Sequence, residues 1–142
     1  MCRNCDYAAL LESASMTLNE NRLSVLEAIG NNSYPLSAAD IFRIVERHRP
    51  INRVTVYRIL DLLVEHGLVE RLSTGGRSFY YGLAPNAHHQ PHPHFYCQRC
   101  GQMDCLNPDS LVVDTRRFSD TFAGKVEKVE VRLDGVCKNC MR

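Results

Sequence analysis

Residues 52–67 of the chain read NRVTVYRILDLLVEHG. The apolar residues of this stretch that recur at i, i+3, i+4 and i+7 are Val56, Ile59, Leu60 and Leu63. This spacing is that of one buried face of an α-helix. Asn52 is a favourable N-cap, and Gly67 is a favourable residue just past a helix end. The stretch therefore predicts an amphipathic helix between Asn52 and Gly67.

Two helices are expected before this one, and a β-hairpin after it. Residues 18–29 and 38–49 carry apolar residues at helical spacing, with Asn19 and Ser37 as N-caps. Residues 68–72 and 78–83 have the character of short strands, and the glycine pair between them favours a hairpin turn. Three helices followed by a hairpin are the order of a winged helix-turn-helix. An ordinary helical subdomain with a hairpin attached is the alternative on this pattern alone.

Positive charge is concentrated in and before the third predicted helix. The formal net charge is only +1, but residues 43–58 hold a single acid, Glu46. The basic residues of this stretch are Arg43, Arg47, His48, Arg49, Arg53 and Arg58. A local cationic patch, more than net charge, is what a nucleic-acid-binding face needs.

The composition is that of a globular protein without export or membrane signals. No apolar run approaches the roughly 18 residues that span a bilayer, and residues 1–7 lack the layout of a secretory signal. We therefore expect a cytoplasmic protein with no membrane partner. Cytoplasmic thiols stay reduced, so the seven cysteines favour metal ligation over disulfides.

The second half of the chain differs in composition from the first. Residues 84–94 are rich in proline and histidine and are interpreted as a hinge. Beyond it we expect strands over 95–97 and 126–133 and a helix over 109–122. The predicted fold class is α+β, with a winged helix-turn-helix domain over 1–83 and a small α/β domain over 95–142.

Two Cys-x-x-Cys pairs lie in this second domain. The four cysteines are Cys97, Cys100, Cys137 and Cys140. A two-residue spacer lets both thiolates of a pair bind one ion, and two pairs complete a closed tetrahedral site. Such a site is structural, and zinc is its expected occupant. Buried free cysteines and a thioredoxin-like redox pair agree poorly with the pattern, since neither pair lies at a strand-to-helix junction.

These motifs together resemble the ferric uptake regulator superfamily of metal-sensing bacterial repressors. The resemblance rests on residues 54–60 (VTVYRIL), 65–69 (EHGLV), 92–101 (HPHFYCQRCG) and the Cys-x-x-Cys at 137–140. It implies a C-terminal dimerisation domain and a homodimer that binds a palindromic operator in double-stranded DNA through the third helix. The DNA-binding residues expected on this basis are Arg22, Arg53, Thr55, Tyr57 and Arg58.

A second metal site is expected from the histidine-rich hinge. His88, His89, His92 and His94 lie within seven residues, and side chains two positions apart on a strand share a face. The resemblance adds Glu70, at a position where zinc-sensing members carry a ligand. Cys105 stands where the family usually has an acid. The predicted regulatory ligands are Glu70, His89, His92, His94 and Cys105.

Zinc is the expected regulatory metal, with ferrous iron as the alternative. Residues 34–36 (YPL) lack the histidine that iron sensors of the family carry there, and the thiol of Cys105 favours a softer metal. The sequence thus predicts a zinc-responsive repressor that is not an enzyme and has no small-molecule substrate. A peroxide or redox sensor remains an alternative, as does a zinc-stapled interaction module. Cys2 and Cys5 are either exposed thiols or an accessory metal site.

Overall fold

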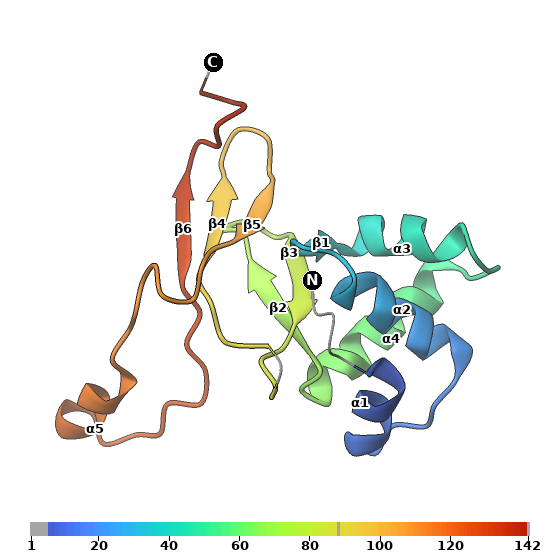
Figure 1. The fold of residues 1–142 in the computed structure, drawn as a ribbon, viewed down its shortest axis with the longest axis horizontal. Helices are drawn as coiled ribbons and strands as arrows, with labels where there is room; N and C mark the ends of the chain where they lie inside the picture. Colours follow the sequence, from blue (N-terminus) through green and yellow to red (C-terminus); the bar gives the residue numbers. More distant parts are fainter. Residues whose placement is uncertain (1–5, 88, 142) are drawn as a thin grey trace. The chain divides into compact units, whose positions relative to one another are not determined.

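The protein, seen here as a computed structural model, is described over residues 6–87 and 89–141 and consists of two compact units (Figure 1). The first unit extends to Pro91 and the second begins at His92. This division falls within the segment 84–94 that the sequence predicts as a hinge. Helices and strands occur together in the chain, which confirms the α+β class.

Four α-helices form most of the first unit. They are α1 (Tyr7–Ser13), α2 (Glu20–Gly30), α3 (Ala38–Glu46) and α4 (Arg53–Glu65). The N-cap residues predicted for the last three are confirmed: the side chains of Asn19, Ser37 and Asn52 each accept a hydrogen bond from a backbone N–H in the first turn. Among the described residues no helix has the length and apolar character to cross a membrane.

Helix α1 was not expected from the sequence. Asp6 caps it by accepting a hydrogen bond from the backbone N–H of Ala9 at 3.1 Å. Tyr7 and Leu11 are buried against the rest of the unit, and the Tyr7 hydroxyl donates to the side-chain oxygen of Asn31 at 3.2 Å. Two buried residues in seven give too short a pattern for helical periodicity to be recognised.

The N-cap of α4 is expected to contribute measurably to the stability of the protein. The Asn52 side-chain oxygen accepts a hydrogen bond from the Thr55 N–H at 2.8 Å. Asn52→Ala is therefore expected to lower the free energy of unfolding by about 1 kcal/mol, measured by urea titration. Asn52→Ser keeps an acceptor oxygen and should lose much less. Equal losses in the two variants would show that the cap is not responsible.

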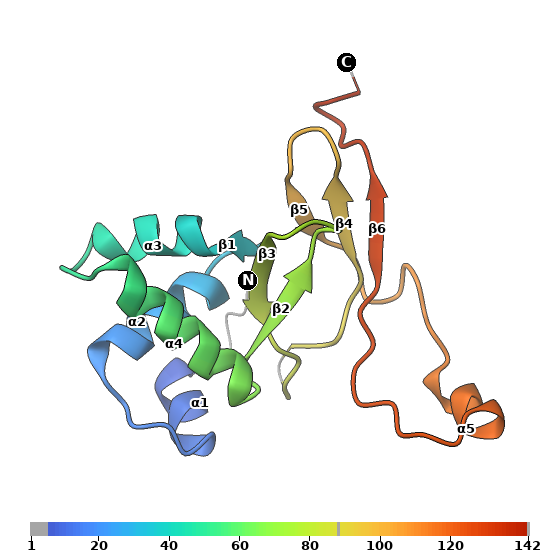
Figure 2. The same ribbon diagram turned by 180° about the vertical axis from the view of Figure 1, so that it is seen from behind.

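A small antiparallel sheet completes the first unit (Figure 2). Its strands are β1 (Leu36–Ser37), β2 (Val69–Ser73) and β3 (Phe79–Leu83), in the order β1-β3-β2. The β2–β3 pair is the predicted hairpin, with Arg71 opposite Tyr81 and Glu70 opposite Gly82. Gly67 turns the chain from α4 into β2 with a φ of 75°, a left-handed conformation that glycine adopts without strain.

The second unit contains a three-stranded sheet. Its strands are β4 (His94–Cys97), β5 (Met103–Cys105) and β6 (Arg132–Gly135), in the order β5-β4-β6. Strand β4 pairs antiparallel with β5 and parallel with β6. Because β6 runs parallel to β4, both strands begin at the same end of the sheet. The long segment between β5 and β6 brings the chain back to that end.

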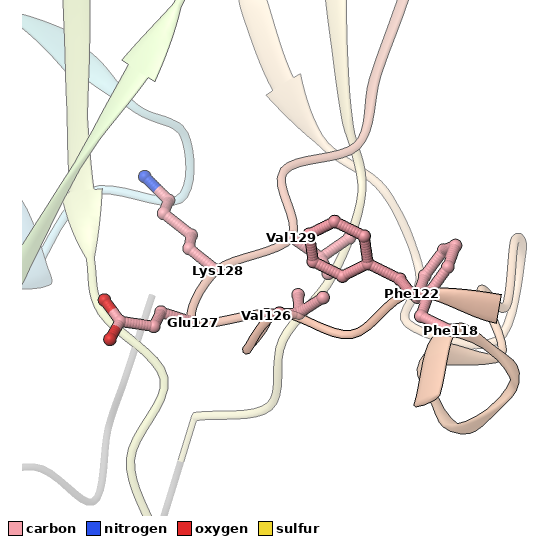
Figure 3. Close-up of a pocket in the computed structure, with 7 residues that line it drawn as sticks. Phe118, Phe122, Val126, Glu127, Lys128 and Val129 are labelled. Carbon is pink, nitrogen blue, oxygen red and sulfur yellow. The ribbon is translucent and has the colours of Figure 1, made fainter. Parts of the chain in front are cut away.

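Two elements predicted for the segment that leads from β5 into β6 are wrong. The helix expected over 109–122 is reduced to a 3-10 turn, η1 (Thr115–Arg117), and to α5 (Phe118–Thr121). The strand expected over 126–133 begins only at Arg132. A helical or alternating pattern becomes a stable element when its apolar face is buried. Here the large apolar side chains stay exposed, and several line an open pocket of about 370 Å³ beside α5 (Figure 3).

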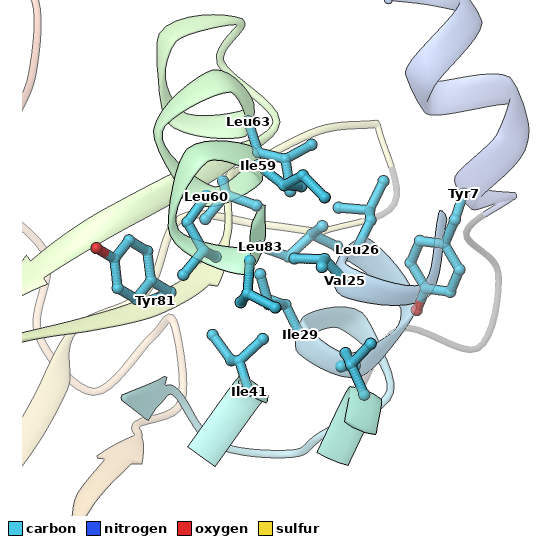
Figure 4. Close-up of a cluster of buried hydrophobic side chains, with 14 of the residues drawn as sticks. Tyr7, Val25, Leu26, Ile29, Ile41, Ile59, Leu60, Leu63, Tyr81 and Leu83 are labelled. Atoms are coloured by element: carbon cyan, nitrogen blue, oxygen red, sulfur yellow. The ribbon is translucent and has the colours of Figure 1, made fainter. Parts of the chain in front are cut away.

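The main hydrophobic core lies in the first unit. Side chains from all four helices and from β3 meet there, with those of α2 and α4 at the centre (Figure 4). The buried face of α4 is the predicted one: Val56, Ile59, Leu60 and Leu63. In the second unit the buried residues among those described are Pro93, His94, Cys97 and Met103. So small a core needs a further source of stability.

Candidate functional site

The sheet of the second unit brings the two Cys-x-x-Cys pairs together. Cys97 ends β4, and Gly101, with a φ of 79°, turns the chain just after Cys100. The second pair follows β6, which pairs with β4 so that Gly135 lies beside Cys97. The sulfur atoms of Cys97, Cys100, Cys137 and Cys140 all lie within 4.8 Å of one another. We call this group the four-cysteine cluster.

The geometry of the four-cysteine cluster suits a tetrahedral ion. With metal–sulfur bonds of about 2.3 Å, the edge of a sulfur tetrahedron is about 3.8 Å. The sulfur atoms of Cys100 and Cys137 are 3.7 Å apart. The four residues therefore have both the donor type and the spacing for zinc.

The electrostatics of the cluster also favour a cation. The backbone N–H groups of Cys100 and Cys137 donate to the Cys97 sulfur at 3.5 and 3.3 Å. These bonds lower the pKa of the Cys97 thiol to about 6, because they stabilise its thiolate. The neighbouring Cys137 side chain, together with burial, raises the pKa of Cys140 to about 12. Four thiolates crowded in this way need a bound cation to coexist.

A second group of metal-binding side chains lies in the same unit. His92, His94 and Cys105 have ligand atoms that lie within 4.8 Å of one another. His94 and Cys105 stand directly opposite each other on β4 and β5, and the two imidazole rings have centroids 4.6 Å apart. His94 is buried, whereas Cys105 is exposed. We call these three residues the histidine–cysteine group.

The other predicted regulatory ligands belong to the first unit. Glu70 is half-buried on β2. His89 forms a tight turn with Asn86, in which each backbone N–H donates to the other residue's carbonyl. His88, Cys2 and Cys5 lie outside the described residues.

Of the four DNA-binding residues predicted on α4, three lie on its outer, exposed face. Arg53, Tyr57 and Arg58 are exposed, and Thr55 is half-buried. Tyr57 has an exposed fraction of 40%, so it is not a core aromatic residue. The guanidinium of Arg53 stacks over the Phe42 ring at 5.2 Å, which holds it at the start of the helix.

Arg22 lies elsewhere, on α2. Its Nη1 atom donates to the backbone carbonyl of Thr17 at 2.7 Å, so part of its guanidinium supports the turn before the helix.

Sequence reasoning missed one residue of this unit, Arg71, which joins α4 to the hairpin through an ion pair with Asp61. Strand alternation places Arg71 on one face of β2, but no local pattern identifies a partner on another element.

A family model and a curated relative each match most of this chain. The model described as the ferric uptake regulator family matches residues 13–133. The chain is 29% identical over 132 residues to the ferric uptake regulation protein of Haemophilus influenzae, an alignment that covers 92% of this chain and 88% of that protein.

Solved structures share the fold. The Vibrio cholerae ferric uptake regulator superposes with a TM-score of 0.73 at 22% identity, covering 93% of this chain and all of that one. A zinc uptake regulator solved in complex with zinc and DNA gives a TM-score of 0.65 at 22% identity, covering 94% of this chain and 89% of that one. At these identities the similarity concerns the fold alone.

Proposed function

The chain belongs to the ferric uptake regulator family of metal-responsive transcriptional regulators, and from this membership we propose that it represses transcription with zinc as corepressor. It would act in the cytoplasm, as a homodimer on palindromic operator DNA, without enzymatic activity. The observation that carries the choice of zinc is the histidine–cysteine group.

The donor set supports zinc over iron. Two imidazoles and a thiolate suit zinc, whereas carboxylate-rich sites suit manganese or ferrous iron better. Zinc sensors similar to this chain often carry a cysteine near the end of the second wing strand. Here Gly82 occupies that strand opposite Glu70 and offers no ligand. We propose that Cys105, opposite His94, supplies the thiolate instead.

Two further ligands are proposed, Glu70 on the family resemblance and His89 on its place among the hinge histidines. Glu70 and His89 carry donor atoms suited to completing the coordination of an ion held by the histidine–cysteine group. An ion that also uses a ligand of the winged-helix unit would bind some domain arrangements better than others. It would thereby shift their populations toward the DNA-binding one.

We assign a structural zinc ion to the four-cysteine cluster. A closed set of four thiolates leaves no position open for a substrate or a water molecule. Such an ion contributes to folding free energy, which the small core of the second unit requires.

The outer face of α4 is proposed to enter the major groove. Arg53 and Arg58 are exposed on this face and can contact phosphates or guanine. Tyr57 lies between them and can pack on a thymine methyl group. Among the arginines that precede α4, Arg43 and Arg49 form ion pairs with Asp40 and Glu20, so these two add little to the positive charge of the surface.

The partner proposed for the second unit is another copy of this chain. Its exposed large apolar side chains are Leu111, Val112, Val113, Phe118, Phe122, Val126, Val129, Leu133 and Met141. Phe118, Phe122, Val126 and Val129 line the open pocket beside α5 (Figure 3). Apolar surface of this extent marks an interface, and a two-fold dimer would match a palindromic operator.

One observation favours a second candidate, a peroxide or redox sensor. The Cys105 thiol is exposed beside two histidines, and exposed thiols oxidise readily once ionised. Zinc sensing would make DNA binding depend on zinc, whereas redox sensing would make it depend on an oxidant such as peroxide.

The deciding experiment is a DNA-binding titration across metals. The zinc-loaded protein would first be used to select the DNA duplex that it binds most tightly from a pool of random sequences. We call this DNA the selected duplex. Affinity would then be measured with zinc, ferrous iron, manganese and nickel, and with zinc plus peroxide. Zinc dependence at two ions per chain supports the proposal. Tight binding with one zinc per chain, unaffected by further metal, excludes zinc sensing.

The DNA-binding surface has its own test in Arg58→Ala. Operator affinity should fall about tenfold, which corresponds to about 1.4 kcal/mol, because an arginine contact is worth about 1–3 kcal/mol. The salt dependence should become shallower if the contact is to phosphate. Zinc content should not change. Arg116→Ala, which removes an exposed charge in the second unit, is the control and should bind the selected duplex normally.

A further inference from the structure

Arg71 connects three elements of the winged-helix unit. It lies on β2, and its Nη2 atom forms an ion pair with Asp61 of α4 at 2.9 Å. Its guanidinium also stacks on two rings of β3, at 5.3 Å from the centre of Phe79 and 5.8 Å from that of Tyr81. One side chain of β2 thus contacts both the proposed recognition helix, α4, and the other strand of the hairpin, β3.

The register of the hairpin explains this arrangement. Arg71 is directly opposite Tyr81, and Phe79 is opposite Ser73, two positions further along β2. Side chains two positions apart share a face, so both rings lie on the face that Arg71 occupies. The Arg71 side chain is 35% exposed, and that of Asp61 is 71% exposed.

Asp61 occupies an unexpected place for an acid. It lies one helical turn after Tyr57 and Arg58, on the exposed side of α4. A carboxylate so near a DNA-binding face repels phosphates. Its contact with Arg71 offers a physical reason for its presence there.

We propose that Arg71 is a positioning residue that fixes the angle between α4 and the β2–β3 hairpin for DNA binding. This inference rests on the proposed function, because it assumes that α4 and the hairpin bind DNA together. Asp61 and the two rings hold the guanidinium between them, so the recognition helix and the wing move as one body. Arg71 would act on the operator through this geometry, without needing a phosphate contact of its own.

Asp61→Asn provides the sharpest test, because electrostatics and positioning predict opposite results. Neutralising an acid beside DNA should leave affinity unchanged or increase it. Loss of the Arg71 anchor should instead weaken binding to the selected duplex at least fivefold. The matched control is Asp40→Asn, which removes an acid paired at 2.9 Å with Arg43 inside α3, where no second element is joined. It should bind as tightly as wild type or more tightly.

A double-mutant cycle separates positioning from direct contact. If Arg71 acts through Asp61, Arg71→Gln with Asp61→Asn should be no weaker in DNA binding than Arg71→Gln alone. Direct phosphate contact predicts that Arg71→Gln weakens binding while Asp61→Asn does not, and this result would overturn the inference. Thermal unfolding and zinc content of each variant identify any loss that comes from misfolding. If wild type itself fails to bind DNA with zinc, the proposed function fails. If wild type binds and Asp61→Asn binds equally well, only the role of Arg71 fails.

Discussion

Cys137→Ser is expected to leave the second unit unfolded and the protein monomeric. The four-cysteine cluster loses one of four ligands, and structural zinc contributes an apparent binding free energy of about 10 kcal/mol or more. The unit cannot replace this contribution, since its buried residues among those described are only Pro93, His94, Cys97 and Met103. Zinc content, circular dichroism and analytical ultracentrifugation would measure the loss.

Cys105→Ser is the matched control for that experiment. It also removes one thiol from the second unit, but from outside the four-cysteine cluster. It should remain folded and dimeric with the structural zinc bound. A Cys137→Ser protein that stays dimeric and stable would exclude a structural role for the cluster.

His94→Ala is expected to abolish the zinc response while the structural zinc stays bound. The histidine–cysteine group would keep two ligands, so DNA affinity at saturating zinc should fall about 100-fold, toward that of the metal-free protein. Linkage requires that the selected duplex tighten the wild-type metal site by the same factor that zinc tightens DNA binding. His66→Gln, at the exposed end of α4, is the control and should respond normally. Equal DNA affinity of wild type and His94→Ala at saturating zinc would falsify the sensing role.

Variants of Cys105 extend this test, because His94 is buried and its replacement could also disturb packing. Cys105→Ser should lose the zinc response, and the charge-transfer absorption of the cobalt-loaded site should disappear with the thiolate. Cys105→Asp should bind zinc more weakly and shift the response toward manganese or ferrous iron, which prefer carboxylate. An unchanged metal preference in Cys105→Asp would remove Cys105 from the ligand set.

Local sequence signals predicted the first unit well. Asn19, Ser37 and Asn52 are caps in the structure, and Gly67 has the left-handed conformation expected past a helix end. These features depend on interactions between residues a few positions apart, which a sequence pattern records directly. The Arg71–Asp61 ion pair joins residues of two different elements, so no local sequence pattern indicates it.

The second unit was predicted less well, for a related reason. The Cys-x-x-Cys pairs and the strand at Cys97 were recognisable because their chemistry is local. The helix over 109–122 and the strand over 126–133 were inferred from apolar residues that prove to be exposed, such as Phe122 and Val129. An apolar pattern predicts that a face will be buried, but it does not say whether the same chain buries it.

The parallel pairing of β4 with β6 has a consequence for the kinetics of folding. In the first unit α2, α3 and α4 follow one another along the chain and contact their neighbours, so folding there requires little loop closure. In the second unit His94 must find Arg132 before the sheet can form. Closing so long a loop costs chain entropy before any contact compensates for it. We therefore expect refolding in two phases: a fast one that is insensitive to zinc concentration and a slower one that chelators arrest.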